Sequence, residues 1–417
     1  MNVSCQKWSK IPLGEIFKTT SGGTPLSSCK EYYDGGTIPW INSGELNTPF
    51  INAAEHFITP IGLKSSSAKM LPVDSVLIAM YGATAGRASL LKIPACVNQA
   101  ICAVLPSKNY SPLFLKYYLD TIYQYLVDLS SGSARSNLSQ EVLQKVKIPA
   151  PDLPTQLRIA AILGSIDEKI ELNRKKIVEL KALAKTIYDY WFVQFDFPDK
   201  NGTPYKSSGG KMVWNEQLKR EIPEGWEVKS IGSIETNIVT GKTPNTDDAT
   251  NFGNDIPFLT IDDLRGHVYT FTSQRSLSEK GAKLQSSKFI PPNSLCVSCI
   301  GTIGEISFSA KCSQTNQQIN SIVFDDDNYR EYIYFYLKQY FRSAIVKTGN
   351  TFANMNKGEF ARILCLVPSK KTLACFHAIA QSVFEQLRNM EHQIMLQIEA
   401  RELLLPLLMN GQVKVKE

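Results

Sequence analysis

The stretch Ser21-Gly-Gly-Thr-Pro25 occurs a second time in the chain, in altered form, as Thr240-Gly-Lys-Thr-Pro244. Other short matches follow the two copies in the same order: Ile38-Pro39-Trp40 with Ile256-Pro257-Phe258, and Val97-Asn98-Gln99-Ala100-Ile101 with Thr315-Asn316-Gln317-Gln318-Ile319. Solenoid repeats have periods of roughly 20–50 residues, far shorter than the separation of these copies. The pattern therefore predicts one duplicated domain, and the divergence of the copies suggests two similar but different targets.

Each copy has the features of a mixed α/β module. Its short β-type run, at 75–80 in the first copy and 294–300 in the second, is followed by a glycine that favours a turn. Aromatic-rich segments at 113–126 and 329–341 are predicted helices whose aromatic side chains face the core.

A long predicted helix follows each module. Between residues 154 and 191 the only glycine is Gly164, and apolar residues recur at alternating intervals of three and four, as in a heptad seam with one polar position that fixes the register. Because neither seam can be buried alone, we predict an antiparallel two-helix coiled coil, about 50 Å long for the first helix. The alternative is that each helix packs on its own module. The first seam comprises Ile166, Ile170, Asn173, Ile177, Leu180, Ala184 and Ile187, and the second, between 372 and 408, comprises Ile379, Val383, Leu387, Met390, Ile394, Ile398 and Leu405.

The composition is that of a globular protein of two or three domains, since the 417 residues are 43% hydrophobic and 20% charged. No apolar run has the length of a signal peptide or a membrane span, and nine scattered cysteines are typical of free thiols in a reducing compartment. We therefore expect a cytoplasmic protein without a membrane partner. The net charge of +6 is modest for a nucleic-acid binder, so either the basic groups cluster on one face or a partner supplies part of the phosphate binding.

The sequence lacks the motifs of common nucleotide and methyl-transfer chemistry. It has no Gly-x-x-x-x-Gly-Lys-Ser/Thr loop and no Asn-Pro-Pro-Tyr-like tetrapeptide of an amino-methyltransferase. Cys296-x-x-Cys299 corresponds to Leu77 and Met80 in the first copy, which favours strand core over a metal site. The four histidines are unmatched between the copies, and Asp325-Asp326-Asp327 is predicted to cap a loop. We therefore expect a protein that recognises a target and is not itself an enzyme.

Several short motifs accompany the order module, helix, module, helix. They are Leu13-Gly14 before the first Gly-Thr-Pro loop, Ile38-Pro-Trp-Ile-Asn-Ser-Gly-Glu-Leu46, Asn98-Gln99, Pro154-Thr-Gln-Leu-Arg-Ile-Ala160, Gly209-Gly-Lys-Met-Val213 and Ile222-Pro-Glu-Gly-Trp226. With these motifs the chain resembles, over nearly its full length, the specificity (S) subunit of Type I restriction–modification systems, the HsdS family. The second helix departs from the pattern, with Leu373-Ala-Cys-Phe-His377 where the first has Gln156-Leu-Arg158.

The resemblance implies an α+β chain, with two similar mixed α/β target-recognition domains separated by an antiparallel coiled coil of two spacer helices. We expect these domains at 1–152 and 222–368, the central spacer helix at 153–195, a connector at 196–221 and the C-terminal spacer helix at 369–417. Each domain would read one half of a bipartite, gapped site in double-stranded DNA. The helices would set the spacing and dock two DNA adenine methyltransferase (M) subunits, which restriction (R) subunits would join. The chain would hold no cofactor, because S-adenosylmethionine and ATP with Mg would belong to the partner subunits.

The candidate DNA contacts are polar residues at corresponding loop positions, because amide and guanidinium groups read base edges while Lys, Ser and Thr position on phosphates. Identical pairs such as Lys64 with Lys283 suit phosphate contact, and diverged pairs such as Arg87 with Glu305 suit specificity. Asn98-Gln99 and its counterpart suit a structural role at least as well as readout. The candidates in the first module are Ser21, Thr24, Lys64, Lys69, Tyr81, Thr84, Arg87, Ser133, Arg135 and Asn137, and those in the second are Thr240, Lys242, Thr243, Lys283, Lys288, Thr302, Asn350, Asn354 and Lys357.

Two alternatives belong to other classes of function. One is an enzyme that methylates or cleaves DNA itself, which the missing motifs argue against. The other is a protein-interaction scaffold whose helices pair with another coiled coil and whose modules never read DNA.

Overall fold

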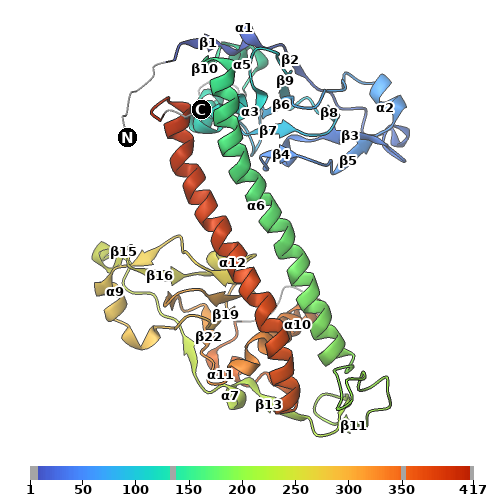
Figure 1. Ribbon diagram of the computed structural model, residues 1–417, viewed down its shortest axis with the longest axis vertical. Coiled ribbons are helices and arrows are strands. Elements are labelled where there is room, and N and C mark those ends of the chain that lie inside the picture. The colour runs from blue at the N-terminus through green and yellow to red at the C-terminus, as the bar shows by residue number, and fades with distance from the viewer. Residues whose placement is uncertain (1–7, 132–137, 349–353, 414–417) are drawn as a thin grey trace. The chain divides into compact units, whose positions relative to one another are not determined.

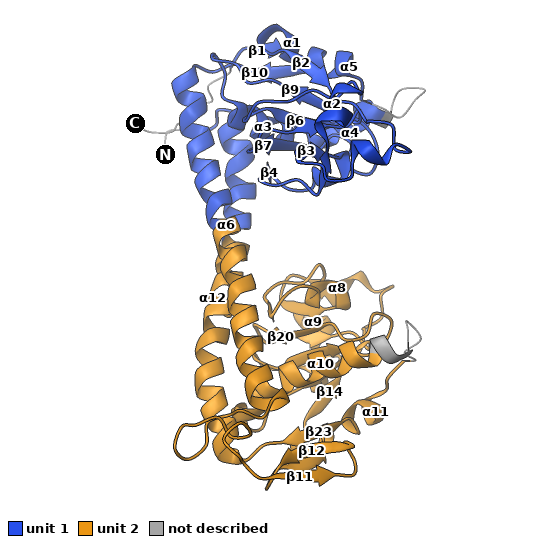
Figure 2. Cartoon of the chain, turned by 90° about the vertical axis from the view of Figure 1, so that its right-hand side faces the viewer, with its two compact units in different colours: residues 1–169, 397–417 blue, residues 170–396 orange. Residues whose placement is uncertain are grey.

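The computed structural model of the chain describes residues 8–131, 138–348 and 354–413. The chain forms two compact units (Figure 2): unit 1 comprises residues 1–169 and 397–417, and unit 2 comprises residues 170–396. Unit 1 thus contains both chain ends, while unit 2 is one continuous segment.

Unit 1 is built on a five-stranded sheet with the order β2-β9-β6-β7-β4. All its pairings are antiparallel except that of β4 with β7. A smaller sheet has the order β5-β3-β8, and β1 pairs with β10. The strands are β1 (Lys10–Pro12), β2 (Thr19–Ser21), β3 (Ile38–Ile41), β4 (Phe50–Ile51), β5 (His56–Ile58), β6 (Val76–Ala79), β7 (Ala88–Leu91), β8 (Cys96–Val97), β9 (Ile101–Val104) and β10 (Lys147–Pro149).

Unit 2 repeats this sheet as β14-β22-β19-β20-β17, again with one parallel pairing, between β17 and β20. The smaller sheet has the order β15-β18-β16-β21. The same connectivity in both units confirms the duplication that the sequence predicts. The strands are β13 (Glu227–Ser230), which pairs with β23 (Leu364–Val367), β14 (Ile238–Thr240), β15 (Phe252–Gly253), β16 (Ile256–Leu259), β17 (Tyr269–Thr270), β18 (Ser276–Leu277), β19 (Leu295–Ser298), β20 (Ile306–Ser309), β21 (Gln314–Thr315) and β22 (Ile319–Ile322).

The central strands β6 and β19 are buried at every position, so neither shows the alternation of buried and exposed residues that is typical of a half-buried strand. Cys296 lies in β19 and Cys299 directly after it, and both are buried in the core as free thiols. Burial raises the pKa of Cys296 to about 12, which keeps it protonated. These positions are strand core, as the apolar residues at the same positions of the first copy predict.

Helices cover the sheets and connect the strands. In unit 1 they are α1 (Leu13–Ile16), α2 (Pro60–Lys64), α3 (Pro112–Thr121), α4 (Tyr123–Ser131) and α5 (Gln140–Lys145), and in unit 2 α7 (Ile231–Ile234), α8 (Ile261–Leu264), α9 (Glu279–Lys283), α10 (Arg330–Thr348) and α11 (Lys357–Ala361). The segment between the first long helix and the second module contains a hairpin of β11 (Met212–Asn215) and β12 (Arg220–Pro223), which the glycines and prolines of this segment did not predict.

The two long helices, α6 (Leu153–Tyr188) and α12 (Lys370–Met409), pack along each other (Figure 1). Their contacts in unit 2 are antiparallel, since Asn173 Nδ2 donates to Gln393 Oε1 at 3.2 Å while the rings of Tyr188 and Phe376 lie 6.3 Å apart. The predicted antiparallel pair is therefore confirmed. The apolar seam holds the two helices together, and buried Asn173 satisfies its amide across it.

Each unit uses parts of both long helices, so the alternative in which each helix packs on its own module is wrong. Leu163 near the start of α6 and Leu408 near the end of α12 belong to the same core cluster of unit 1. One seam position is also wrong: Ile379 is 44% exposed, and the inward face of α12 passes through Phe376 and Ala380. The close packing of Phe376 on the end of α6 determines which face turns inward.

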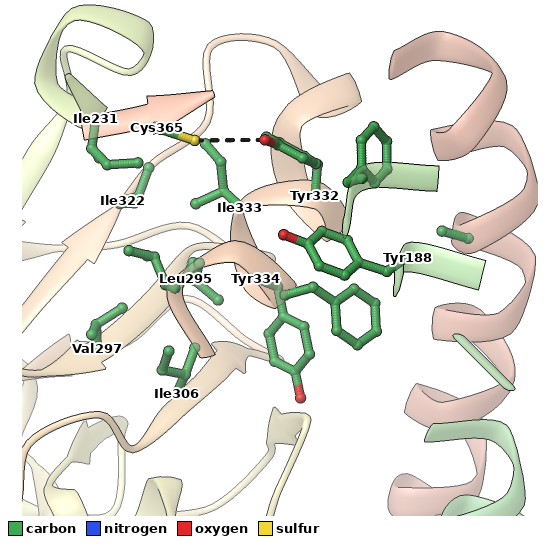
Figure 3. Packing of buried hydrophobic residues seen from close by; sticks show 14 of the residues in the cluster. Tyr188, Ile231, Leu295, Val297, Ile306, Ile322, Tyr332, Ile333, Tyr334 and Cys365 are labelled. Atoms are coloured by element: carbon green, nitrogen blue, oxygen red, sulfur yellow. Dashed lines mark hydrogen bonds between the residues drawn. The ribbon is translucent and has the colours of Figure 1, made fainter. Parts of the chain in front are cut away.

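The end of α6 anchors in an aromatic cluster of unit 2. A π-helix at Asp189–Val193 continues α6, and Phe192 packs against Tyr332 and Phe376 with ring centroids 4.7 and 4.8 Å apart. Figure 3 shows Tyr188 and Tyr334 in the same cluster, beside the sheet residues Leu295 and Val297. Aromatic pairs of this kind stabilise a core beyond the area that they bury.

Candidate nucleic-acid interface

The Gly-Thr-Pro loops have the same backbone geometry in both units, because each runs against the strand-end loop that contains the Asn-Gln pair. A Cβ on Gly22 would lie 1.8 Å from the carbonyl oxygen of Val97, and one on Gly241 would lie 2.2 Å from that of Thr315. Only glycine fits such contacts. The repeated glycine therefore fixes the position of the polar residues that follow it.

A threonine in each of these loops holds the glutamine of the Asn-Gln pair. Thr24 Oγ1 donates to Gln99 Oε1, and Thr243 Oγ1 donates to Gln317 Oε1 at 2.6 Å. Both glutamines are exposed, and their amide nitrogens make no hydrogen bond to any described residue. The loops thus present two oriented, unpaired amide donors. A glutamine amide is a group that reads base edges in the major groove.

The asparagine of each pair has a structural role. Asn98 Oδ1 accepts from the Ala100 backbone at 3.1 Å, and Asn316 Oδ1 accepts from the Gln318 backbone at the same distance. From the sequence, the Asn-Gln pair could serve either a structural role or base readout. The structure gives the structural role to the asparagine and leaves the glutamine available for readout. Among the candidates nearby, Ser21 and Lys242 are exposed, while Thr240 turns its hydroxyl to Asn320 Oδ1 at 2.6 Å.

The short helices α2 and α9 place the matched lysines. Thr59 and Ser278 cap their first turns by accepting from the backbone nitrogens of Gly62 and Gly281. Lys64 and Lys283 end these helices and are exposed, and Lys283 Nζ lies 3.0 Å from Glu279 Oε2. Lys69 is exposed and Lys288 half-buried. Exposed amines at the same backbone position in both units suit contact with phosphate, which carries no sequence information.

The loop after the central strand has the same turn in both units but different side chains. Gly82 and Gly86 have φ of +86° and +81°, and Gly301 and Gly304 have φ of +78° and +88°. Each of these glycines therefore occupies the left-handed region, which costs other residues free energy. The loop is a turn in both units.

The charge at the end of this loop differs between the units. In unit 1 the exposed Arg87 lies over the Tyr123 ring at 5.2 Å. At the corresponding position of unit 2, Glu305 Oε1 lies 3.5 Å from Arg265 Nε. Comparison of the two sequence repeats does not predict that Arg265 lies here. One loop therefore presents a cation and the other an ion pair. The other loop candidates are the half-buried Tyr81 and Thr84, whose hydroxyl donates to the Ser43 carbonyl at 2.9 Å, and the exposed Thr302.

The last candidates lie near the loop after α4 and α10. Asn354 and Lys357 are exposed, and Lys357 begins α11, which Asn356 caps. Ser133, Arg135, Asn137 and Asn350 lie outside the described residues.

No group of His, Cys, Asp and Glu side chains among the described residues has the arrangement of a metal site. Within the same residues, no helix has the length and apolar character needed to cross a membrane.

Two copies of one scaffold, with the same loop backbones and different polar side chains, define a duplicated target-recognition protein. Residues 6–182 and residues 223–400 each match the family described as the Type I restriction modification DNA specificity domain. The chain belongs to this family. It is a specificity subunit, the member of a Type I restriction–modification complex that recognises the DNA target without catalysing a reaction, and the cofactors reside in the other subunits.

Two relatives and one solved structure show the extent of the similarity. The chain is 30% identical over 344 residues to the Type I restriction enzyme HindI specificity subunit of Haemophilus influenzae, covering 70% of this chain and 74% of the relative. It is 28% identical over 422 residues to the MjaIX specificity subunit of Methanocaldococcus jannaschii, covering 98% and 94%. The crystal structure of the S subunit from M. genitalium matches with a TM-score of 0.62 at 14% identity, over 100% of this chain and 98% of that one. The predicted family and fold class are confirmed.

Proposed function

We propose that each unit reads one half of a bipartite, gapped site in double-stranded DNA, and that α6 and α12 set the spacing and dock two adenine methyltransferase subunits. The observation that carries the proposal is that the loops have the same backbone geometry in both units but different side chains. Gly22 and Gly241 impose the same close approach, while Arg87 and the Arg265–Glu305 pair differ in charge. Two such modules would bind DNA in similar ways and select different bases.

The loop candidates divide into two groups under this proposal. The exposed lysines at the ends of α2 and α9 contact phosphates, so they contribute to affinity for any sequence. Arg87, which Glu305 replaces in unit 2, contacts a base edge and contributes to the choice of sequence, while the oriented glutamines, identical in both units, contact the DNA in the same way in each half-site. Restriction subunits would join the complex through the methyltransferase subunits, which would hold S-adenosylmethionine.

Methylation mapping tests this function. The chain would be co-expressed with an adenine methyltransferase subunit of a Type I system, and N6-methyladenine would be mapped in the host DNA by single-molecule sequencing. We expect a gapped motif that is methylated only when the chain is present. If a stable complex forms and no such motif appears, the scaffold alternative is favoured, and if the chain transfers methyl groups alone, the enzyme alternative is favoured.

Single substitutions test the division between units. Arg87→Ala is expected to relax or change one half of the motif and leave the other half intact, because it alters one unit only. Lys64→Gln is expected to lower methylation at all sites and to reduce the salt dependence of DNA binding by about one phosphate contact. Lys108→Gln, on an exposed loop, is a control with the same change of charge. Loss of both half-sites in Arg87→Ala would contradict the assignment.

A further inference from the structure

Unit 2 contains a cavity of about 510 Å³ between α6, α10 and α12. Its inner wall is apolar and aromatic and includes Tyr188, Tyr334, Phe335, Phe384 and Leu387, each at least nine-tenths buried. Figure 3 shows Tyr188 projecting from the end of α6 toward α10, where its ring lies 5.9 Å from that of Tyr332 and 5.2 Å from that of Phe335. A volume between roughly 300 and 1,000 Å³ with mostly apolar walls is typical of small-molecule sites.

Four cations line the mouth of this cavity. Lys181 Nζ donates to the Gly266 carbonyl at 3.0 Å and lies 4.0 Å from Glu391 Oε1, and Lys185 forms an ion pair with Asp189. Lys338 and Arg342 are one helical turn apart on α10, and neither forms an ion pair with any carboxylate among the described residues. The mouth therefore carries two exposed cations, Lys338 and Arg342, that have no ion-pair partner among the described residues.

Two residues of the cavity wall, Lys338 and Tyr334, also bear on which ligand would bind. The Lys338 ammonium lies 5.0 Å from the centroid of the Tyr334 ring, and burial, followed by the charge of Lys181, lowers the pKa of Lys338. Tyr334 is 3% exposed, and its hydroxyl makes no hydrogen bond to any described residue. A bound anion would relieve the repulsion between the cations, and the Tyr334 hydroxyl is a further group to which a polar ligand atom can hydrogen-bond.

The repeat shows that the charge is not required by the scaffold. In the register that aligns Tyr117 with Phe335, Lys338 corresponds to Asp120 and Arg342 to Gln124. In unit 1 this position holds an ion pair, since Lys116 Nζ lies 2.7 Å from Asp120 Oδ2. The equivalent helix of unit 1 thus contains a neutral ion pair, whereas Lys338 and Arg342 of unit 2 have no ion-pair partner among the described residues. The difference between the copies points to a property of unit 2 alone.

We propose that this cavity binds an aromatic ring joined to a phosphate, which is the chemistry of a nucleotide. The ring occupies the apolar space beside Tyr188 and Phe335, and the phosphate lies between Lys338 and Arg342. Arginine and lysine bind phosphate strongly, and aromatic side chains form favourable contacts with bases. Gln339 and Asp189 at the cavity edge offer polar groups to the ring. Such a ligand can come from two sources, a free nucleotide or a nucleotide within a DNA strand.

Calorimetric titration of the full chain, in complex with its methyltransferase subunits, tests this site. The probes are AMP, adenosine and inorganic phosphate. AMP is expected to bind at least about tenfold more tightly than adenosine or phosphate alone, because only AMP fills both parts of the cavity. The double substitution Lys338→Gln and Arg342→Gln is expected to weaken AMP binding by at least about tenfold. Lys219→Gln with Lys229→Gln, on exposed lysines of unit 2, is the matched control and should leave AMP binding unchanged.

A second pair of measurements separates the sources and guards against misfolding. Ala184→Phe fills the cavity without changing its charge, and it should also abolish AMP binding while thermal unfolding stays cooperative. A short single-stranded oligonucleotide that displaces AMP from the wild type identifies the strand as the source, and failure to displace it identifies the free nucleotide. The proposal is overturned if AMP does not bind, if adenosine or phosphate binds as tightly, or if the variants bind AMP like the wild type.

Discussion

At the scale of single residues, the glycine of each Gly-Thr-Pro loop is the strictest requirement of the recognition scaffold. Gly241→Ala would place a methyl group 2.2 Å from the carbonyl oxygen of Thr315, so the loop must move. We expect the free energy of unfolding to fall by at least about 1–3 kcal/mol. Gly44→Ala is the control, because a Cβ there meets nothing within 4 Å. Equal urea unfolding midpoints for the two variants would show that the close approach is not needed.

Glu235 gives unit 2 a pH dependence of stability. Its side chain is fully buried and accepts from the Asp325 backbone nitrogen at 2.8 Å, and burial raises its pKa from 4.5 to about 7. The folded state therefore binds a proton more tightly than the unfolded state. By linkage, the contribution of Glu235 to stability is full below pH 4.5 and is lost as pH rises to about 7.

Glu235→Gln is expected to remove this decline, because the amide does not titrate. Urea unfolding at pH 4.5, 6 and 7.5 measures it, with Glu221→Gln on an exposed strand as the control. An unchanged slope in Glu235→Gln would mean that another group causes the pH dependence.

At the scale of elements, a buried ion pair joins the long helices in unit 1. Asp167 Oδ1 on α6 lies 2.9 Å from Arg401 Nη1 on α12, and Asp167 Oδ2 accepts from the Tyr117 hydroxyl at 2.7 Å. Because Asp167 is 2% exposed, Arg401→Met leaves its charge buried without a cation. We expect a loss of about 3–5 kcal/mol in the stability of unit 1.

A double-mutant cycle with Asp167→Asn measures this coupling, and the double variant should recover part of the loss, since no charge then remains buried. Arg174→Met is the surface control, because its pair with Glu171 is exposed and should contribute less than about 1 kcal/mol. Purely additive effects of the two substitutions would contradict the coupling.

At the scale of the whole molecule, the end of the chain completes the core of unit 1. Leu408 is 2% exposed and packs in the cluster that contains Phe114 and Leu163. Leu408→Ala is therefore expected to destabilise unit 1 by about 2–5 kcal/mol, although the substitution lies far along the chain from its first module. Leu403→Ala is the control on the same helix, since Leu403 is 66% exposed. Limited proteolysis with mass spectrometry would locate the opened region, and cleavage confined to unit 2 would contradict this expectation.

Much of the architecture could be predicted because its signals are local. Repeated loops such as Ser21–Pro25 and the heptad seam around Asn173 need only sequence order and spacing to be seen, and they gave the duplication, the antiparallel helices and the family. Exposure on the helix surface was less predictable. Ile379 fits the apolar spacing and is exposed, because Phe376 packs against the end of α6 and turns α12.

Periodicity and repetition thus determined the number of modules and the helix pair, and the resemblance of the motifs to the Type I specificity subunits gave the class of target. Tertiary structure alone decided which member of each Asn-Gln pair keeps an amide nitrogen without a partner among the described residues, that Arg265 meets Glu305, and that four cations line one cavity. The physical reason is that hydrogen bonding and charge compensation depend on distances between residues far apart in sequence. Lys338 is an ordinary lysine in the sequence, and only the packing of α6 against α10 leaves it beside Lys181 without an ion-pair partner among the described residues.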